Sequence, residues 1–265
     1  MARSVSASMA RILERLELER PLLLTSAELA RMLEEEDIST PAAVFASRMR
    51  EKGWLLPTGQ RGVWEFAPAA VAGAYSSMDP LIGLKALLAA HEGLSCSLTF
   101  AAAAWAMGLA DRAPATIDVA FDARPTGMRL PDGISAHAYS PTLEPVERRG
   151  VPCLAPESVV VHMATRPAEV GSWQSASEWL VELAHELDEG RVLEELSGRS
   201  VSVRARTGYL LQGMRPDVAE AIMGLGAPTS KVRFGPRRES IRNDERWMIS
   251  DTVLPFDPRK MEDAR

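Results

Sequence analysis

TPAAVFASRMREKGWLLPTGQRGVWEFAP, residues 40–68, decides how the N-terminal part of the chain is interpreted. Its first half predicts a helix that opens at Thr40, with Pro41 at the first helical position, where a missing amide N–H costs nothing. Gly53 closes this helix, and its apolar residues follow helical spacing: Ala42, Phe45, Ala46 and Met49. Two runs, WLLPT and VWEFA, are joined by GQRG and predict a β-hairpin.

Two further helices are expected before this stretch. The first covers Ser6–Leu18 and has an apolar stripe of Met9, Ile12, Leu13 and Leu16. The second follows Thr25, which has the capping-box spacing to Glu28. Helix, helix, turn, helix and hairpin is the order of a winged helix-turn-helix, so the sequence predicts a DNA-binding domain of this kind over residues 1–70.

The outward face of the predicted third helix suits the major groove of DNA, because its side chains are small near the helix start and basic later. The residues expected at base edges or adjoining phosphates are Thr40, Ala43, Val44, Ser47 and Arg48. The residues expected to contact the DNA backbone are Arg50, Lys52, Gln60 and Arg61. The alternative is a small helical cap whose arginines are only solvated.

Charge is distributed unevenly along the 265 residues, whose net charge of −6 taken alone disfavours a nucleic-acid partner. Residues 39–62 hold four cations and one acid, residues 169–198 one cation and eight acids, and residues 199–246 ten cations and five acids. The basic first zone therefore keeps DNA binding open.

Residues 70–80 are small, polar and bounded by proline, and predict a link to a second domain over residues 78–265, with a candidate subdivision near 166. Helices are expected in LIGLKALLAAHE, SLTFAAAAWAMGLA, PESVVVHMAT, WQSASEWLVELAHEL, DEGRVLEELS, VRARTGYLLQGM and DVAEAIMGLG. Strands are expected in ATIDVAF, which ends at DARP, in GISAHAYS and GVPCLA around a charged turn, EPVERRG, and in WMISDTVLPF. The fold class is therefore α+β, with a winged helix-turn-helix followed by a larger mixed α/β domain.

The sequence offers little catalytic chemistry. None of the four histidines stands at a metal-ligand spacing, and the phosphate-loop, nucleophile-elbow and dinucleotide motifs are absent, so no metal, cofactor or enzymatic activity is expected. Asp118 and Asp122 would share one face of a strand and leave open a metal-dependent nucleic-acid enzyme as a rival. Two lone cysteines, no secretory signal and no apolar run long enough for a membrane span favour a cytoplasmic protein.

Two later charged segments allow two interpretations each. Arg204, Arg206 and Arg215 could form a second phosphate-binding surface, or they could pair with the acids that precede them. The acidic region of residues 178–195 could be a solvated face, a contact for a basic partner, or an internal counterweight to these arginines.

Several blocks along most of the chain resemble the AbiEi family, the antitoxins of AbiE-type (type IV) toxin–antitoxin operons. These blocks are SAELARML, residues 41–68, LTFAAAAWAMGLADRAPATIDVAF, SASEWLVELAHEL and VRARTGYLLQGM, the last similar to an Arg-x-Gly-Tyr-Leu-Leu segment of the family. The family often has His before its Gly-Leu turn, whereas Met107 precedes Gly108 in this chain, which leaves the role of the turn open.

The resemblance implies an N-terminal winged helix that binds double-stranded DNA at its own promoter and represses the operon. It also implies a C-terminal domain that counteracts a nucleotidyltransferase-like toxin, with direct contact between the two left open. The alternative is a winged-helix regulator whose second domain senses a small effector.

Overall fold

The computed structural model describes residues 5–70, 77–123 and 127–261. The chain forms two compact units, one of residues 1–94 with 128–134 and the other of residues 95–127 with 135–265. The first unit therefore extends past residue 70 and takes in a segment that was assigned from the sequence to the second domain. Most of the expected link, residues 71–76, lies outside the described residues, and so do residues 124 and 125 of the DARP turn.

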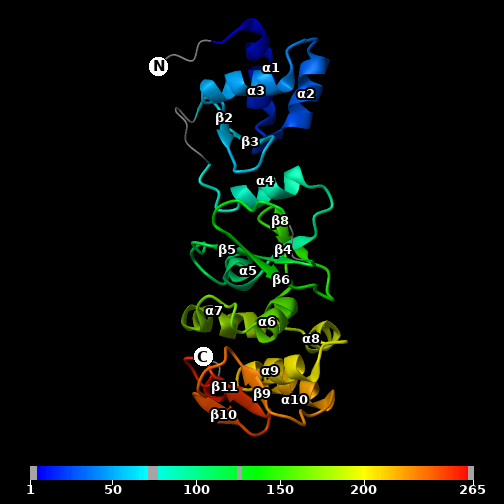
Figure 1. Ribbon diagram of the computed structural model, residues 1–265, viewed down its shortest axis with the longest axis vertical. Coiled ribbons are helices and arrows are strands. Elements are labelled where there is room, and N and C mark those ends of the chain that lie inside the picture. Colours follow the sequence, from blue (N-terminus) through cyan, green and yellow to red (C-terminus); the bar gives the residue numbers. More distant parts are fainter. Residues whose placement is uncertain (1–4, 71–76, 124–126, 262–265) are drawn as a thin grey trace. The chain divides into compact units, whose positions relative to one another are not determined.

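The first unit begins with three helices and a hairpin, in the order predicted, and a fourth helix follows them (Figure 1). Its elements are α1 (Ala7–Glu19), β1 (Leu23–Thr25), α2 (Ser26–Glu35), α3 (Ala42–Glu51), β2 (Leu55–Pro57), β3 (Val63–Phe66) and α4 (Ile82–Ala90). Strand β1 was not predicted from the sequence; it pairs antiparallel with β3 and gives a sheet of order β1-β3-β2.

Local signals in the sequence explain where the first helices begin. Thr25 and Glu28 form the expected capping box: the Glu28 amide donates to Thr25 Oγ1 (3.2 Å) and the Thr25 amide to Glu28 Oε2 (2.8 Å). Ser6 caps α1 by accepting from the Met9 amide (3.3 Å). These caps satisfy backbone donors that have no partner inside a helix.

Helix α3 packs its predicted apolar stripe into the core of the first unit. Phe45, Ala46 and Met49 are buried there beside the expected stripe of α1 and the hairpin residue Trp54. Pro41 is the residue before the helix and not its first helical position. Gly53 has φ +73°, a left-handed conformation that glycine adopts without strain, and so turns the chain from α3 towards β2.

The second unit begins with a five-stranded mixed sheet of order β6-β5-β4-β8-β7, followed by helices and a three-stranded sheet of order β10-β11-β9 (Figure 1). Its first elements are β4 (Cys96–Leu98), α5 (Phe100–Met107), β5 (Ile117–Phe121), β6 (Ile134–Ala138), β7 (Val146–Arg148) and β8 (Val151–Cys153). The later elements are α6 (Pro156–Thr165), α7 (Trp173–His185), α8 (Glu189–Glu195), α9 (Val201–Leu211), α10 (Pro216–Gly224), β9 (Val232–Phe234), β10 (Arg242–Asp244), β11 (Ile249–Asp251) and the 3₁₀ turn η1 (Pro258–Lys260).

The expected α+β class is confirmed, with local corrections. The charged stretch EPVERRG is not only a turn, because β7 lies within it and pairs with β8. The arginine-rich stretch after residue 230 contains β9 and β10, which the sequence analysis missed. Leu98 ends a strand, so the helix in LTFAAAAWAMGLA starts only at Phe100.

The Gly-Tyr-Leu-Leu segment of α9 lies in the core of the second unit. A Cβ on Gly208 would lie 2.0 Å from Cη2 of the buried Trp247, so glycine leaves room for that ring. Tyr209 is fully buried and donates its hydroxyl to Asp251 (3.0 Å). The loose motif seen in the sequence is therefore a packing motif of this unit.

Both cysteines are unpaired and buried, and burial raises the pKa of Cys96 to about 11. Across the described part of the chain, every helix is too short or too polar to cross a membrane.

Candidate functional site

Most of the side chains predicted to face DNA lie on the outward side of α3. Ala43, Ser47 and Arg48 are exposed, Val44 is 44% exposed, and Thr40 is half-buried just before the helix. Phe45 and Met49 point to the core. The amphipathic pattern of the sequence therefore predicted correctly which side of the helix is buried and which side is exposed.

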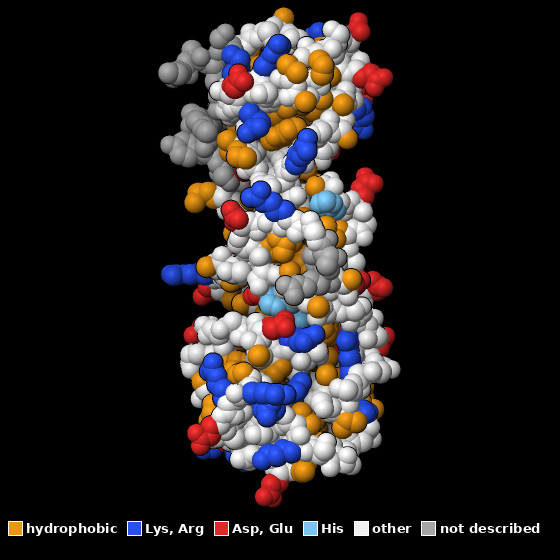
Figure 2. All heavy atoms as spheres, viewed as in Figure 1, with side chains coloured by type: hydrophobic (Ala, Val, Ile, Leu, Met, Phe, Trp, Pro, Cys, Tyr) orange, Lys and Arg blue, Asp and Glu red, His pale blue; other side chains and the backbone are white. Residues whose placement is uncertain are grey.

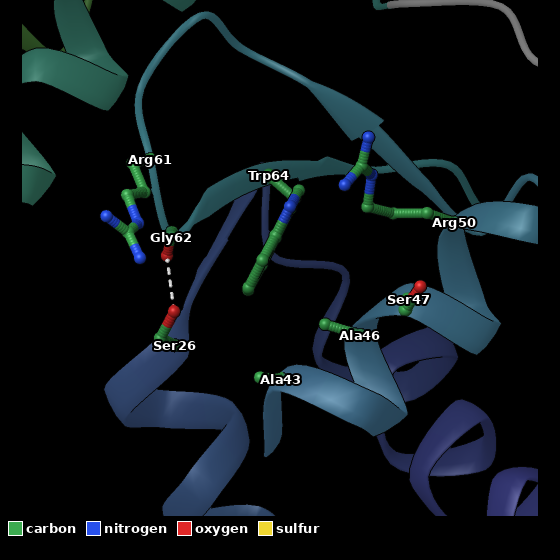
Figure 3. A pocket seen from close by; sticks show the side chains of 8 residues that line it. All are labelled: Ser26, Ala43, Ala46, Ser47, Arg50, Arg61, Gly62 and Trp64. Atoms are coloured by element: carbon green, nitrogen blue, oxygen red, sulfur yellow. Dashed lines mark hydrogen bonds between the residues drawn. The ribbon is translucent and has the colours of Figure 1, made fainter. Parts of the chain in front are cut away.

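A pocket of about 600 Å³ lies between α3, the start of α2 and the hairpin (Figure 3). It brings together four residues predicted to contact DNA, Ala43, Ser47, Arg50 and Arg61, and four others, Ser26, Ala46, Gly62 and Trp64. In Figure 3 Trp64 projects from β3 towards Ala43 and Ala46, between the two arginines. The pocket therefore has an apolar wall and cationic sides.

The hairpin is fixed to the start of α2 through Gly62. The Ser26 amide and hydroxyl both donate to the Gly62 carbonyl, at 2.7 and 3.1 Å. Gly62 has φ +78°, and a Cβ there would lie 2.7 Å from Ser26 Oγ. Because a larger residue would be strained and would clash, this glycine sets the position of the neighbouring Arg61.

Three arginines at this site are exposed and form no ion pair with any residue that the structure describes: Arg48, Arg50 and Arg61. In the upper part of Figure 2, Lys and Arg side chains lie around apolar side chains on the visible face of the first unit. Cations without an acidic partner give a surface a positive potential, which attracts phosphate groups. Lys52, half-buried after α3, lines no wall of the pocket.

Gln60, which was predicted to contact the DNA backbone, forms a hydrogen bond within the protein. Its side-chain amide donates to the Arg129 carbonyl (3.2 Å), and Pro131 lies next to Gly59. The tip of the hairpin therefore packs on residues 128–134, a later segment of the chain that belongs to the same unit. No spacing rule predicts this contact, because its two partners are 69 positions apart in the sequence.

The later arginines make contacts within the second unit. Arg204 Nη1 donates to the Leu225 carbonyl (2.8 Å), and Arg206 Nε to the Arg233 carbonyl (2.7 Å). Arg215 donates to the carbonyls of Ala184 and Leu187, at 3.1 and 2.6 Å, and pairs with Asp217 (2.8 Å). Burial lowers the pKa of Arg206. These half-buried guanidinium groups satisfy backbone acceptors, which differs from the open basic surface considered in the sequence analysis.

One acid from the acidic region does balance an arginine inside the second unit. Glu195 is fully buried and pairs with Arg199 (2.9 Å). The remaining donors to its carboxylate are Tyr139 Oη, Ser158 Oγ (2.8 Å) and the amides of Thr142 (2.9 Å) and Leu143 (3.0 Å). A buried carboxylate is tolerated when all its acceptor sites are used in this way.

The carboxylates considered for catalysis have separate partners. Asp118 accepts from His137 Nε2 (2.8 Å), while the other ring nitrogen of His137 bonds Glu169 (3.0 Å). Asp122 accepts from Ser95 Oγ (2.5 Å). Burial lowers the pKa of His137, but the hydrogen bonds to Asp118 and Glu169 outweigh this effect and raise it overall. No spacing in the sequence predicts this Asp–His–Glu cluster.

His162 lies deeper in the same unit and is fully buried. Its Nδ1 bonds Thr99 Oγ1 (2.8 Å), and its ring stacks on Tyr139 at 4.2 Å between centroids. Burial lowers its pKa to about 2, so the ring is neutral. In residues 5–70, 77–123 and 127–261, no group of three or more His, Cys, Asp or Glu side chains is arranged to hold a metal ion.

Fold and site together define an α+β protein with two units. One unit contains three helices, a hairpin and a fourth helix, and the other is a larger mixed α/β unit. Residues 95–213 match the family described as the AbiEi antitoxin C-terminal domain, and this match starts at the first residue of the second unit. The chain therefore carries an AbiEi antitoxin domain, as its sequence blocks indicated, and an antitoxin domain implies a toxin partner.

Among solved structures, the chain is similar to the RV2827C protein from Mycobacterium tuberculosis. The TM-score is 0.75 at 25% sequence identity, over 96% of this chain and 94% of that chain. No curated protein matches the chain.

Proposed function

We propose that this protein binds double-stranded DNA at its own promoter and represses its operon, and that its antitoxin domain counteracts a nucleotidyltransferase-like toxin. The observation that carries the DNA-binding part is a set of three exposed arginines, none of which forms an ion pair with a residue that the structure describes. Arg50 and Arg61 line the pocket between α3 and the hairpin, and Arg48 lies on the outward face of α3. The AbiEi domain over residues 95–213 supports the antitoxin part.

In this proposal α3 enters the major groove with its outward face. Ala43 and Ser47 are small enough to let the helix approach base edges. Arg48 lies one turn after Val44 on the same face and contacts a phosphate that adjoins these bases. Arg50 and Arg61, on either side of the pocket, contact phosphates of the backbone.

The test is a gel-shift series at increasing salt on the promoter of this gene. Replacing both Arg48 and Arg61 by alanine should weaken binding and reduce the slope of log K against log salt by about two, because each lost phosphate contact removes roughly one counterion. The matched control is Arg237→Ala with Arg238→Ala, which removes two exposed cations from the second unit and should leave affinity and slope unchanged. Equal behaviour of the two double variants would disprove the assignment of the interface.

The antitoxin part is tested separately, by co-expression with the product of the adjacent gene. The wild-type chain should restore growth when that product is toxic. The Arg48→Ala/Arg61→Ala variant should also restore growth when both genes are driven from an unrelated promoter, because its antitoxin domain is intact. Failure of the wild-type chain to restore growth would refute this part alone.

A further inference from the structure

A groove in the second unit lies between α5, the segment that follows it and α7. One section, of about 400 Å³, is largely apolar and is lined by Phe100, Ala101, Pro114, Val170, Ala176 and Trp179 among others. An adjoining section of about 740 Å³ shares Ala101, Pro114 and Trp179 and is closed on one side by the turn from Gly108 to Arg112. The Gly-Leu turn of the sequence therefore forms one wall of this groove.

The adjoining section has an acidic rim. Asp111, Glu178 and Glu182 line it together with one cation, Arg112. All three carboxylates are exposed, and none forms an ion pair or hydrogen bond with another residue in the described parts of the chain. Glu178 and Glu182 lie one turn apart on α7, and like charges at this spacing disfavour a helix unless a cation lies near them.

We propose that this groove binds a segment of a partner protein in which Lys or Arg lies beside an apolar side chain. The apolar side chain enters the section lined by Phe100 and Val170, and the cation lies at the rim formed by Glu178 and Glu182. Trp179 lies between the two sections and offers an aromatic wall to both parts of the ligand. A nucleic acid is disfavoured because the unpaired charge of the rim has the same sign as phosphate.

Under the proposed function the partner is the toxin, and to that extent the inference rests on it. The structure supplies a variant that adds bulk at the lining of the groove without changing its charge. Gly171 lines the apolar section, has no positive φ, and a Cβ on it would meet nothing within 4 Å. Gly171→Leu therefore adds an apolar side chain at this lining position without straining the backbone.

Binding is measured by fluorescence anisotropy with a short labelled peptide of alternating Lys and Leu, on full-length protein. Reversing both rim charges, Glu178→Lys with Glu182→Lys, should weaken binding about tenfold, because each attraction becomes a repulsion of similar size. Gly171→Leu should weaken it by a similar factor. The matched control, Glu186→Lys with Glu194→Lys, makes the same change in net charge at exposed sites outside the groove and should change affinity less than twofold.

Equal weakening by the control pair, or no effect of Gly171→Leu, would overturn the proposal, because binding would then depend on net charge alone. Each variant is also scored for growth rescue and for operator binding. Loss of rescue with operator binding retained places the toxin in the groove, while full rescue by both groove variants excludes it. If the wild-type chain gives no rescue, the proposed antitoxin function fails, and the peptide measurement still decides whether the groove binds basic segments.

Discussion

Replacing Gly208 by alanine should destabilise the second unit, although the same change in an exposed helix would stabilise it. Gly208 lies inside α9, where glycine costs about 1 kcal/mol relative to alanine. A Cβ at this position would lie 2.0 Å from Cη2 of Trp247, whereas ordinary contact begins at 3.4 Å, so the ring would have to move by about 1.4 Å. Trp247 is only 1% exposed and has no free space to enter.

Overpacking of a core costs roughly 1–3 kcal/mol, and a displacement of this size belongs at the upper end. Subtracting the gain of about 1 kcal/mol in helix propensity leaves a net loss of about 2 kcal/mol. Urea unfolding followed by circular dichroism would measure it as a lower midpoint at unchanged slope.

A matched glycine and a double variant separate the clash from other causes. Gly224 ends α10, and a Cβ there would meet nothing within 4 Å, so Gly224→Ala should leave stability unchanged or raise it slightly. Trp247→Leu should make the added methyl group at 208 less costly, so the double variant should lose less stability than the sum of the two single changes. A Gly208→Ala protein as stable as the wild type would refute the reasoning.

Two further predictions concern buried charges in the second unit. The pKa of His137 is raised in the folded state by its hydrogen bonds to Asp118 and Glu169, so this stabilisation is complete below its ordinary value of 6.5 and is lost as the pH rises through the folded pKa. Unfolding free energy should therefore decline above pH 6.5 in the wild type and decline less in His137→Gln; identical pH profiles would contradict this. Glu195→Ala should cost about 3–5 kcal/mol in urea unfolding, because Arg199 and several donors lose their acceptor in the core; a loss below about 1 kcal/mol would show that water replaces the carboxylate.

The elements that were predicted well are those whose signals are local. The apolar spacing of Phe45 and Met49, the Thr25 cap and Gly53 after α3 each act within a few residues, so the sequence alone specifies them. Strands β7, β9 and β10 were missed because their charged residues resemble a turn or a solvated surface. Each is three residues long, and pairing with a neighbouring strand determines its conformation.

The candidate sites divide in the same way. The outward face of α3 follows from helical periodicity, whereas Ser26 and Trp64 join the pocket only through packing of the hairpin on α2. Asp118 and Glu169 of the cluster with His137 are 51 positions apart in the sequence, and no motif spacing connects the three residues. From composition alone, an arginine such as Arg206 is taken for a surface cation. The hydrogen bond from its guanidinium group to a backbone carbonyl becomes visible only in the structure.

Residues 128–134 belong to the first unit, although they follow β5 and end at the first residue of β6, and these two strands are neighbours in the sheet of the second unit. The polypeptide consequently passes from one unit to the other three times, after residues 94, 127 and 134. Neither unit is formed by one continuous segment of the chain. A fragment that ends at residue 94 would therefore lack residues 128–134, on which the tip of the hairpin packs. Domain exchanges between such proteins should therefore carry this insert along with the N-terminal half.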